Sequence, residues 1–228
     1  MASLTWLGHA SFHLESDEGK HIYVDPWLNG NPKTPEDAKD PDRVDIIALT
    51  HGHGDHVGDT VALSKKFPDA EIFALVELKG WLGKQGANVG DMPGANKGGS
   101  VDIDGVKLTF TNAFHSSSSD DGDYLGEPAG IVIRADGKSI YFAGDTCVFG
   151  DMALIGRLYK PDVAVLPIGD HFTMGPEEAA LALELLGNPR CVPCHWGTFG
   201  LLTGTPDKLA ELTSATVERI EPGDSVTV

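Results

Sequence analysis

The sequence has few cysteines, few basic residues and no long hydrophobic run. Its three cysteines, Cys147, Cys191 and Cys194, are too few and too unevenly spaced for a disulfide scaffold. Lysine and arginine number 17 against 34 acidic residues, and the resulting net charge of −17 argues against nucleic acid or anionic membranes as partners. No stretch approaches the roughly 20 apolar residues of a membrane span. The first residues also lack the basic and apolar regions of a signal peptide, so we expect a cytoplasmic protein.

The rest of the composition is that of a globular chain with many loops. Hydrophobic residues make up 41% of the 228 residues, and 28 glycines and 14 prolines favour turns. Short apolar segments predict strands at residues 4–7, 11–14, 21–24, 44–50, 71–75, 106–114, 130–145 (a hairpin), 162–169 and 190–195. Helical patterns follow at residues 57–67, 76–85, 175–189 and 205–215, and residues 86–100 read as a loop. We therefore expect one domain over residues 1–228, with two sheets packed face to face and helices outside.

The strongest functional signal is the segment H-G-H-G-D-H, which directly follows the buried strand predicted at 44–50. Extended residues two apart point to the same side, so His51 and His53 can bind one metal ion together. Asp55 and His56 lie on the following turn and can face a second ion. We expect the two intervening glycines to adopt backbone conformations that would strain other residues.

A competing motif lies near the C-terminal end of the sequence. Residues 191–195 read C-V-P-C-H, and C-x-x-C-H is the pattern that attaches a c-type haem, whereas C-x-x-C alone occurs in thiol redox proteins. On a strand at 190–195 the two cysteines would point to opposite or near-opposite faces, unlike the thiols of a haem clamp. A haem or thiol redox protein is therefore the second hypothesis, and a non-catalytic metal-binding protein is the third.

The pattern H-x-H-x-D-H after a strand resembles the metallo-β-lactamase superfamily. The segments "FTNAFHSSS", "IYFAGDT" and "CVPCHWGTF" place His115, Asp145 and His195 after strands, in the order of that family's remaining ligands. The resemblance implies an α/β fold of the αβ/βα four-layer sandwich type, with two mixed β-sheets packed face to face and helices outside. It also implies a dinuclear metal site at one edge of the sheets, and a histidine at position 53 favours hydrolysis over di-iron oxidation.

The resemblance also implies which side chains hold each metal. The first set is His51, His53 and His115, the second is Asp55, His56 and His195, and Asp145 bridges the two. Histidine with carboxylate suits zinc first, with manganese, iron or nickel as alternatives. More narrowly, "TWLGHASF", "DPWL", "YLGEPAGIVI" and "LPIGDHFTMGPEEAA" resemble a compact hydrolase branch near the ascorbate-6-phosphate lactonase and N-acyl-phosphatidylethanolamine phospholipase D families.

We therefore expect a dinuclear hydrolase in which a metal-bound hydroxide cleaves an ester, lactone or phosphodiester bond of a small molecule. Asp55 is a catalytic candidate as well as a ligand, because it can orient the nucleophile or accept a proton. His171, in a loop after a predicted strand, can donate a hydrogen bond to charge developing on a substrate oxygen. His9 is a substrate-binding candidate by the same resemblance, with a core-packing role equally open, and Asp25 is either a turn residue or a partner of a metal-binding histidine. A homo-oligomer is compatible with the sequence.

Overall fold

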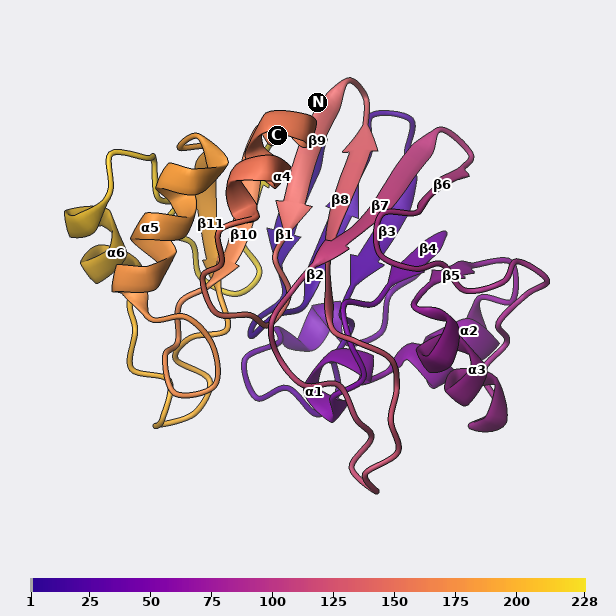
Figure 1. The fold of residues 1–228 in the computed structure, drawn as a ribbon. Helices are drawn as coiled ribbons and strands as arrows, with labels where there is room; N and C mark the ends of the chain where they lie inside the picture. The colour runs from indigo at the N-terminus through magenta and orange to yellow at the C-terminus, as the bar shows by residue number, and fades with distance from the viewer. Residues whose placement is uncertain (1) are drawn as a thin grey trace.

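Two six-stranded β-sheets lie face to face in the computed structural model, which describes residues 2–228 (Figure 1). In spatial order the first sheet contains β12 (Ser225–Thr227), β1 (Ser3–Trp6), β2 (Phe12–Glu15), β3 (His21–Val24), β4 (Ile46–Ala48) and β5 (Glu71–Phe73). The second contains β11 (Arg190–Cys194), β10 (Val163–Pro167), β9 (Lys138–Phe142), β8 (Ala129–Ala135), β7 (Val106–Asn112) and β6 (Ser100–Ile103). Both sheets are mixed, because β3-β4-β5 and β9-β10-β11 pair in parallel and the other neighbours pair antiparallel.

The helices connect the strands and lie outside the pair of sheets. They are η1 (Glu36–Ala38), α1 (Gly54–Val57), α2 (Thr60–Lys66), α3 (Val76–Lys84), α4 (Met152–Tyr159), α5 (Pro176–Leu186) and α6 (Pro206–Leu212). Figure 1 shows α4, α5 and α6 beside β10 and β11, and α2 and α3 beyond β4 and β5. In the described part of the chain, no helix is long and apolar enough to cross a bilayer. The expected fold class is confirmed.

The main apolar core lies between the two sheets and follows from the alternation of side chains along the strands. In β1 and β2 every second residue is buried, as expected for strands with one face toward a core. Aromatic rings from opposite sheets meet there: Phe73 stacks on Phe110 with ring centroids 4.1 Å apart, and Phe12 meets Phe142 edge-on at 5.8 Å. A second apolar cluster fills the space between the second sheet and α4 to α6. The strand β10 contacts both clusters and is buried throughout, which explains its continuous apolar run.

Candidate metal centre

The candidate ligands lie where strands end at one edge of the two sheets. His51 follows β4, His115 follows β7, Asp145 follows β9 and His195 follows β11. Antiparallel pairing through β8 makes β7 and β9 run in the same direction, and β11 runs parallel to β9 through β10. Their carboxyl ends therefore meet near α1, which carries Asp55 and is seen at the lower edge of Figure 1.

The structure brings all seven predicted ligands together. Three groups have ligand atoms that all lie within 4.8 Å of one another: His51, His53 and His115; Asp55, His56 and His195, joined by His9; and His51, His56 and Asp145. The first two groups contain the two sets that the sequence predicts. The third joins Asp145 to both of them through His51 and His56, as a bridging position requires.

Asp145 lies at the centre of the cluster and is almost completely buried. Its Oδ2 is 3.1 Å from Nε2 of His195 and 3.6 Å from Nε2 of His115, and its Oδ1 is 3.4 Å from Nε2 of His56. Nε2 of His56 and Oδ1 of Asp145 are both buried without a hydrogen-bond partner in the described structure. Buried polar atoms without partners are rare, and a cation between them would satisfy both. The residues present therefore fit a metal ion chemically.

The histidines of the first set are held in the form that binds metal. Burial is the largest cause that lowers the pKa of His51, His53 and His115, and repulsion among the neighbouring imidazoles adds to it. The imidazoles are therefore neutral at neutral pH and offer nitrogen lone pairs. Nε2 of His51 and Nδ1 of His53 lie 2.9 Å apart, as expected for two nitrogens that face a common point.

The second set has a different electrostatic balance. Burial alone would lower the pKa of His56, but the carboxylates of Asp145 and Asp25 outweigh it and raise that pKa well above its ordinary value. Burial alone would also raise the pKa of Asp145, but His195 and His56 outweigh it and hold the carboxyl ionised. A proton on Nε2 of His56 and a metal ion would compete for the same negatively charged surroundings, so binding of a metal at His56 would release a proton.

Asp25 fixes the orientation of His56 from behind the cluster. Its Oδ2 is 2.8 Å from Nδ1 of His56, which leaves Nε2 to face the other ligands. The same carboxylate accepts hydrogen bonds from the backbone N–H and the hydroxyl of Thr50, at 2.8 and 2.6 Å. Of the two roles that the sequence left open for Asp25, the structure places it as the partner of a candidate metal-binding histidine.

His9 contacts the cluster through Asp55 and is completely buried. Its Nε2 is 2.9 Å from Oδ2 of Asp55, and its Nδ1 is 2.9 Å from the hydroxyl of Thr198. Burial lowers the pKa of His9 to about 4. Burial would raise the pKa of Asp55, but His56 and the hydrogen bond with His9 outweigh it and lower that pKa. The neutral imidazole therefore donates from Nε2 to the ionised carboxylate and accepts at Nδ1 from Thr198.

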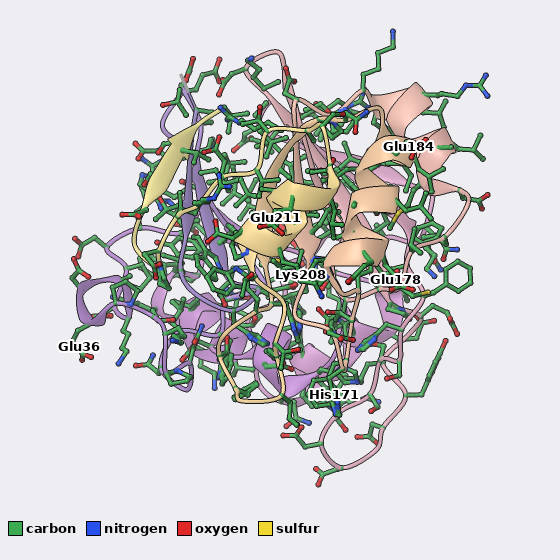
Figure 2. The ribbon with its side chains drawn as sticks, turned by 90° about the vertical axis from the view of Figure 1, so that its left-hand side faces the viewer. Glu36, His171, Glu178, Glu184, Lys208 and Glu211 are labelled. Atoms are coloured by element: carbon green, nitrogen blue, oxygen red, sulfur yellow. The ribbon has the colours of Figure 1, made fainter. Side chains whose placement is uncertain are left out.

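His171 lies outside this hydrogen-bonded cluster, at the lower end of the molecule in Figure 2. Its side chain is exposed, its φ is +59°, and its ring meets Phe172 edge-on with centroids 4.4 Å apart. The adjacent pocket is lined by Phe172 and by Phe199, neither of which the sequence analysis identified. The sequence marks these two phenylalanines only by their proximity to candidate site residues, since Phe172 follows His171 and Phe199 lies shortly after His195.

The two cysteines of C-x-x-C-H lie on β11 and face opposite sides of the sheet. Cys191 belongs to the apolar cluster under the helices, whereas Cys194 belongs to the core between the sheets. Burial raises the pKa of both thiols, which keeps them protonated and unreactive. This placement confirms the opposite orientation that the sequence predicts and provides no paired thiols for haem attachment or redox exchange.

The glycines of H-G-H-G-D-H serve a purpose other than the expected one. Neither Gly52 nor Gly54 has a positive φ, so the expectation of a backbone that would strain other residues is wrong. Gly52 is instead required by close approach, because a Cβ there would overlap the side chain of Leu125. The left-handed conformation falls on the site residues His9, with φ of +55°, and His195, with φ of +52°.

Comparison with known proteins identifies the class to which this fold and this cluster belong. The family described as the beta-lactamase superfamily domain matches residues 20–196, which include every candidate ligand. A solved structure of Igni18, a metallo hydrolase from the archaeon Ignicoccus hospitalis KIN4/I, is 37% identical with a TM-score of 0.86. The match covers 99% of this chain and 97% of that one.

Closer sequence relatives are found among curated proteins. A UPF0173 metal-dependent hydrolase from Herpetosiphon aurantiacus is 46% identical over 235 residues, covering 99% of this chain and 97% of the relative. A protein of the same name from Methanosarcina mazei is 43% identical over 230 residues, and the match covers 98% of this chain and 97% of that relative. The chain therefore belongs to the beta-lactamase superfamily and, within it, to the UPF0173 family of metal-dependent hydrolases.

Proposed function

We propose that this protein uses two divalent cations to hydrolyse an ester, lactone or phosphodiester bond of a small molecule. The observation that carries the proposal is the meeting of six potential ligands in two sets around a seventh, Asp145, with buried ligand atoms that lack hydrogen-bond partners. Zinc is the first candidate for both positions, and manganese, iron or nickel are the alternatives. A surface with a net charge of −17 supports a small substrate rather than a nucleic acid or an anionic membrane.

The side chains divide the work between binding and orientation. His51, His53 and His115 would hold one cation, Asp55, His56 and His195 the other, and Asp145 would contact both. Bound divalent cations lower the pKa of water and polarise an electrophilic carbonyl or phosphoryl group.

Around these ligands, other side chains of the chain have their own tasks. Asp55 is ionised, partly exposed to the pocket and held by His9, so it can orient a water molecule or accept a proton from it. His171 does not line the pocket but contacts the pocket residue Phe172, and its imidazole would donate a hydrogen bond to a substrate oxygen if its loop moved toward the pocket.

Metal analysis of the purified protein tests this proposal. We expect about two equivalents of metal per chain in the wild type, and a loss of at least one equivalent in Asp145→Asn. The variant His21→Asn serves as a matched control, since His21 lies on β3 away from the cluster and its loss should leave both equivalents in place.

Activity on a panel of esters, lactones and phosphodiesters completes the test. We expect turnover that disappears with a chelator and returns with zinc or manganese. The variant His171→Ala should keep its metal and lose roughly ten-fold in kcat. Bound metal without turnover on any substrate of the panel would support a non-catalytic metal-binding protein instead.

A further inference from the structure

The candidate metal centre opens into a pocket of about 350 Å³ whose lining is of two chemically different kinds. The polar part consists of the candidate ligands and one hydroxyl: His53, Asp55, His115, Ser116, Asp145 and His195. The other part consists of the rings of Phe172 and Phe199. A substrate in this pocket can therefore contact both the candidate metal ligands and an aromatic surface.

The two phenylalanines are unusually exposed for their size. Phe172 is 49% exposed and Phe199 is 42% exposed, although both rings face a pocket that a ligand could cover. The ring of Phe199 is held by His9 edge-on at 5.5 Å and by Trp27 at 6.2 Å between centroids. Exposed aromatic rings that are fixed in place at a concave site are typical of ligand-binding surfaces.

The side chains of the pocket supply no positive charge of their own, so an anionic substrate group would depend on the proposed cations alone. None of the described residues that line it is a lysine or an arginine, and two of them, Asp55 and Asp145, are carboxylates. Sites that recognise phosphate or carboxylate groups normally supply arginine, lysine or a helix N-terminus of adequate length. The whole chain has a net charge of −17, which further disfavours the approach of an anion.

We infer that the substrate is a neutral carboxylic ester or lactone with an apolar group that packs against Phe172 and Phe199. This inference rests on the proposed function and narrows its substrate class. Hydrolysis forms a bond from the water oxygen to the acyl carbon and breaks the bond from that carbon to the alkoxy oxygen. One proton of the water passes to the alkoxy oxygen to give the alcohol, and the other is released as the acid ionises.

A series of p-nitrophenyl esters tests the inference on the metal-loaded protein. We expect kcat/KM to rise from the acetate to the hexanoate by about two- to three-fold per methylene, somewhat less than full burial of each methylene would give. Bis(p-nitrophenyl) phosphate should be a poorer substrate than the hexanoate ester by at least about ten-fold, since the pocket adds no cationic side chain to the proposed cations and offers two aromatic rings to the acyl chain.

Variants identify the residues responsible. Phe172→Ala and Phe199→Ala should each lower kcat/KM for the hexanoate about ten-fold, mainly through KM, and change the acetate less than about three-fold. Leu158→Ala is the matched control, because Leu158 is an apolar residue of α4 that is 70% exposed and does not line the pocket. Leu158→Ala should leave kcat/KM for both the hexanoate and the acetate unchanged.

A binding measurement separates failure of the inference from failure of the proposed function. Calorimetry with 2-octanone and 2-butanone, which cannot be hydrolysed, should show tighter binding of the longer ketone by the wild type and not by Phe172→Ala. Absence of any chain-length effect in both rates and binding, or a preference for the phosphodiester, would overturn the inference while metal-dependent hydrolysis still stood. Chain-length-dependent ketone binding without turnover would support the apolar pocket and count against hydrolysis.

Discussion

Asp25 is not among the candidate ligands, but it contacts one of them and can thereby influence metal binding. It is buried, it has a left-handed backbone with φ of +47°, and its carboxylate contacts both His56 and Thr50. Asp25→Asn keeps the shape but replaces an ionised acceptor with an amide, so the orientation and basicity of His56 are no longer fixed. We expect zinc affinity, measured by competition with a chromophoric chelator, to fall about 10- to 100-fold.

The control for this variant is Asp45→Asn. Asp45 also accepts a backbone hydrogen bond, from the N–H of His21, but lies outside the ligand cluster. It should lower the free energy of unfolding without changing zinc affinity. Equal affinities for wild type and Asp25→Asn would contradict the role that we assign to Asp25.

For single residues, the sequence predicted which candidate ligands lie together, but not which hydrogen-bond partners hold them in place. The seven ligand types could be recognised because their spacing and their positions after strands form an ordered pattern. Asp25 and His9 could be noted only as candidates, since their partners, His56 and Asp55, are more than 30 residues away in sequence. Thr198 could not be found at all, because a single hydroxyl in a loop carries no pattern.

The loops that follow β10 and β11 depend on close contact between their backbones. A Cβ at Gly169 would overlap the carbonyl oxygen of His195, so Gly169→Ala must displace the backbone that carries this ligand. We expect a loss of roughly 1–3 kcal/mol in the free energy of unfolding, together with weaker zinc binding. Thermal unfolding of the metal-free protein and chelator competition measure the two effects.

Gly200→Ala is the matched control for this change. It lies in the neighbouring loop, has no positive φ and would place its Cβ more than 4 Å from other atoms. It should change neither stability nor zinc affinity by a measurable amount. If both variants behave alike, packing between the two loops does not hold His195 in position.

The strands β2 and β3 carry a pair of histidines that gives a separate pH dependence. Nε2 of His13 lies 3.0 Å from Nδ1 of His21. Burial, with added repulsion from His21, lowers the pKa of His13 from 6.5 to about 4. Between these two pH values the unfolded chain binds more protons than the folded chain, so stability falls as the pH drops from about 6.5 to about 4.

The variant His13→Gln isolates this contribution. Between pH 7.5 and pH 4 it should lose less stability than the wild type, by up to about 3 kcal/mol, because its side chain does not titrate. Urea unfolding of both metal-free proteins at both pH values measures the difference. Equal losses of stability in the wild type and in His13→Gln would show that the folded state does not oppose protonation of His13.

Most elements could be predicted from periodicity, but the short elements η1 and β12 and two larger ones, β6 and α4, were not. The strand β6 was missed because it is only four residues long and directly follows the glycine-rich loop at 86–99. The helix α4 was missed because it is short and has Gly156 in its interior, which lowers helix propensity. Gly156 packs against the backbone of Leu186 at the end of α5, so tertiary contact explains what the local sequence disfavours.

The whole molecule combines a strongly acidic composition with a cluster of side chains that could hold cations. Of nine histidines, six lie within the groups of potential ligands, and the buried carboxylate of Asp145 among them keeps one oxygen without a hydrogen-bond partner in the described structure. The sheets could be predicted to bring these residues to one edge, because each follows a strand. Their separation into two sets was implied by the family resemblance and required the three-dimensional structure for its geometry.

Anomalous diffraction from crystals of the zinc-loaded protein tests the two-cation centre most directly. We predict two peaks of comparable height in each molecule, one within reach of His51, His53 and His115 and one within reach of Asp55, His56 and His195, with Asp145 contacting both. A single peak, or peaks outside these residues, would contradict a dinuclear centre at this edge of the sheets.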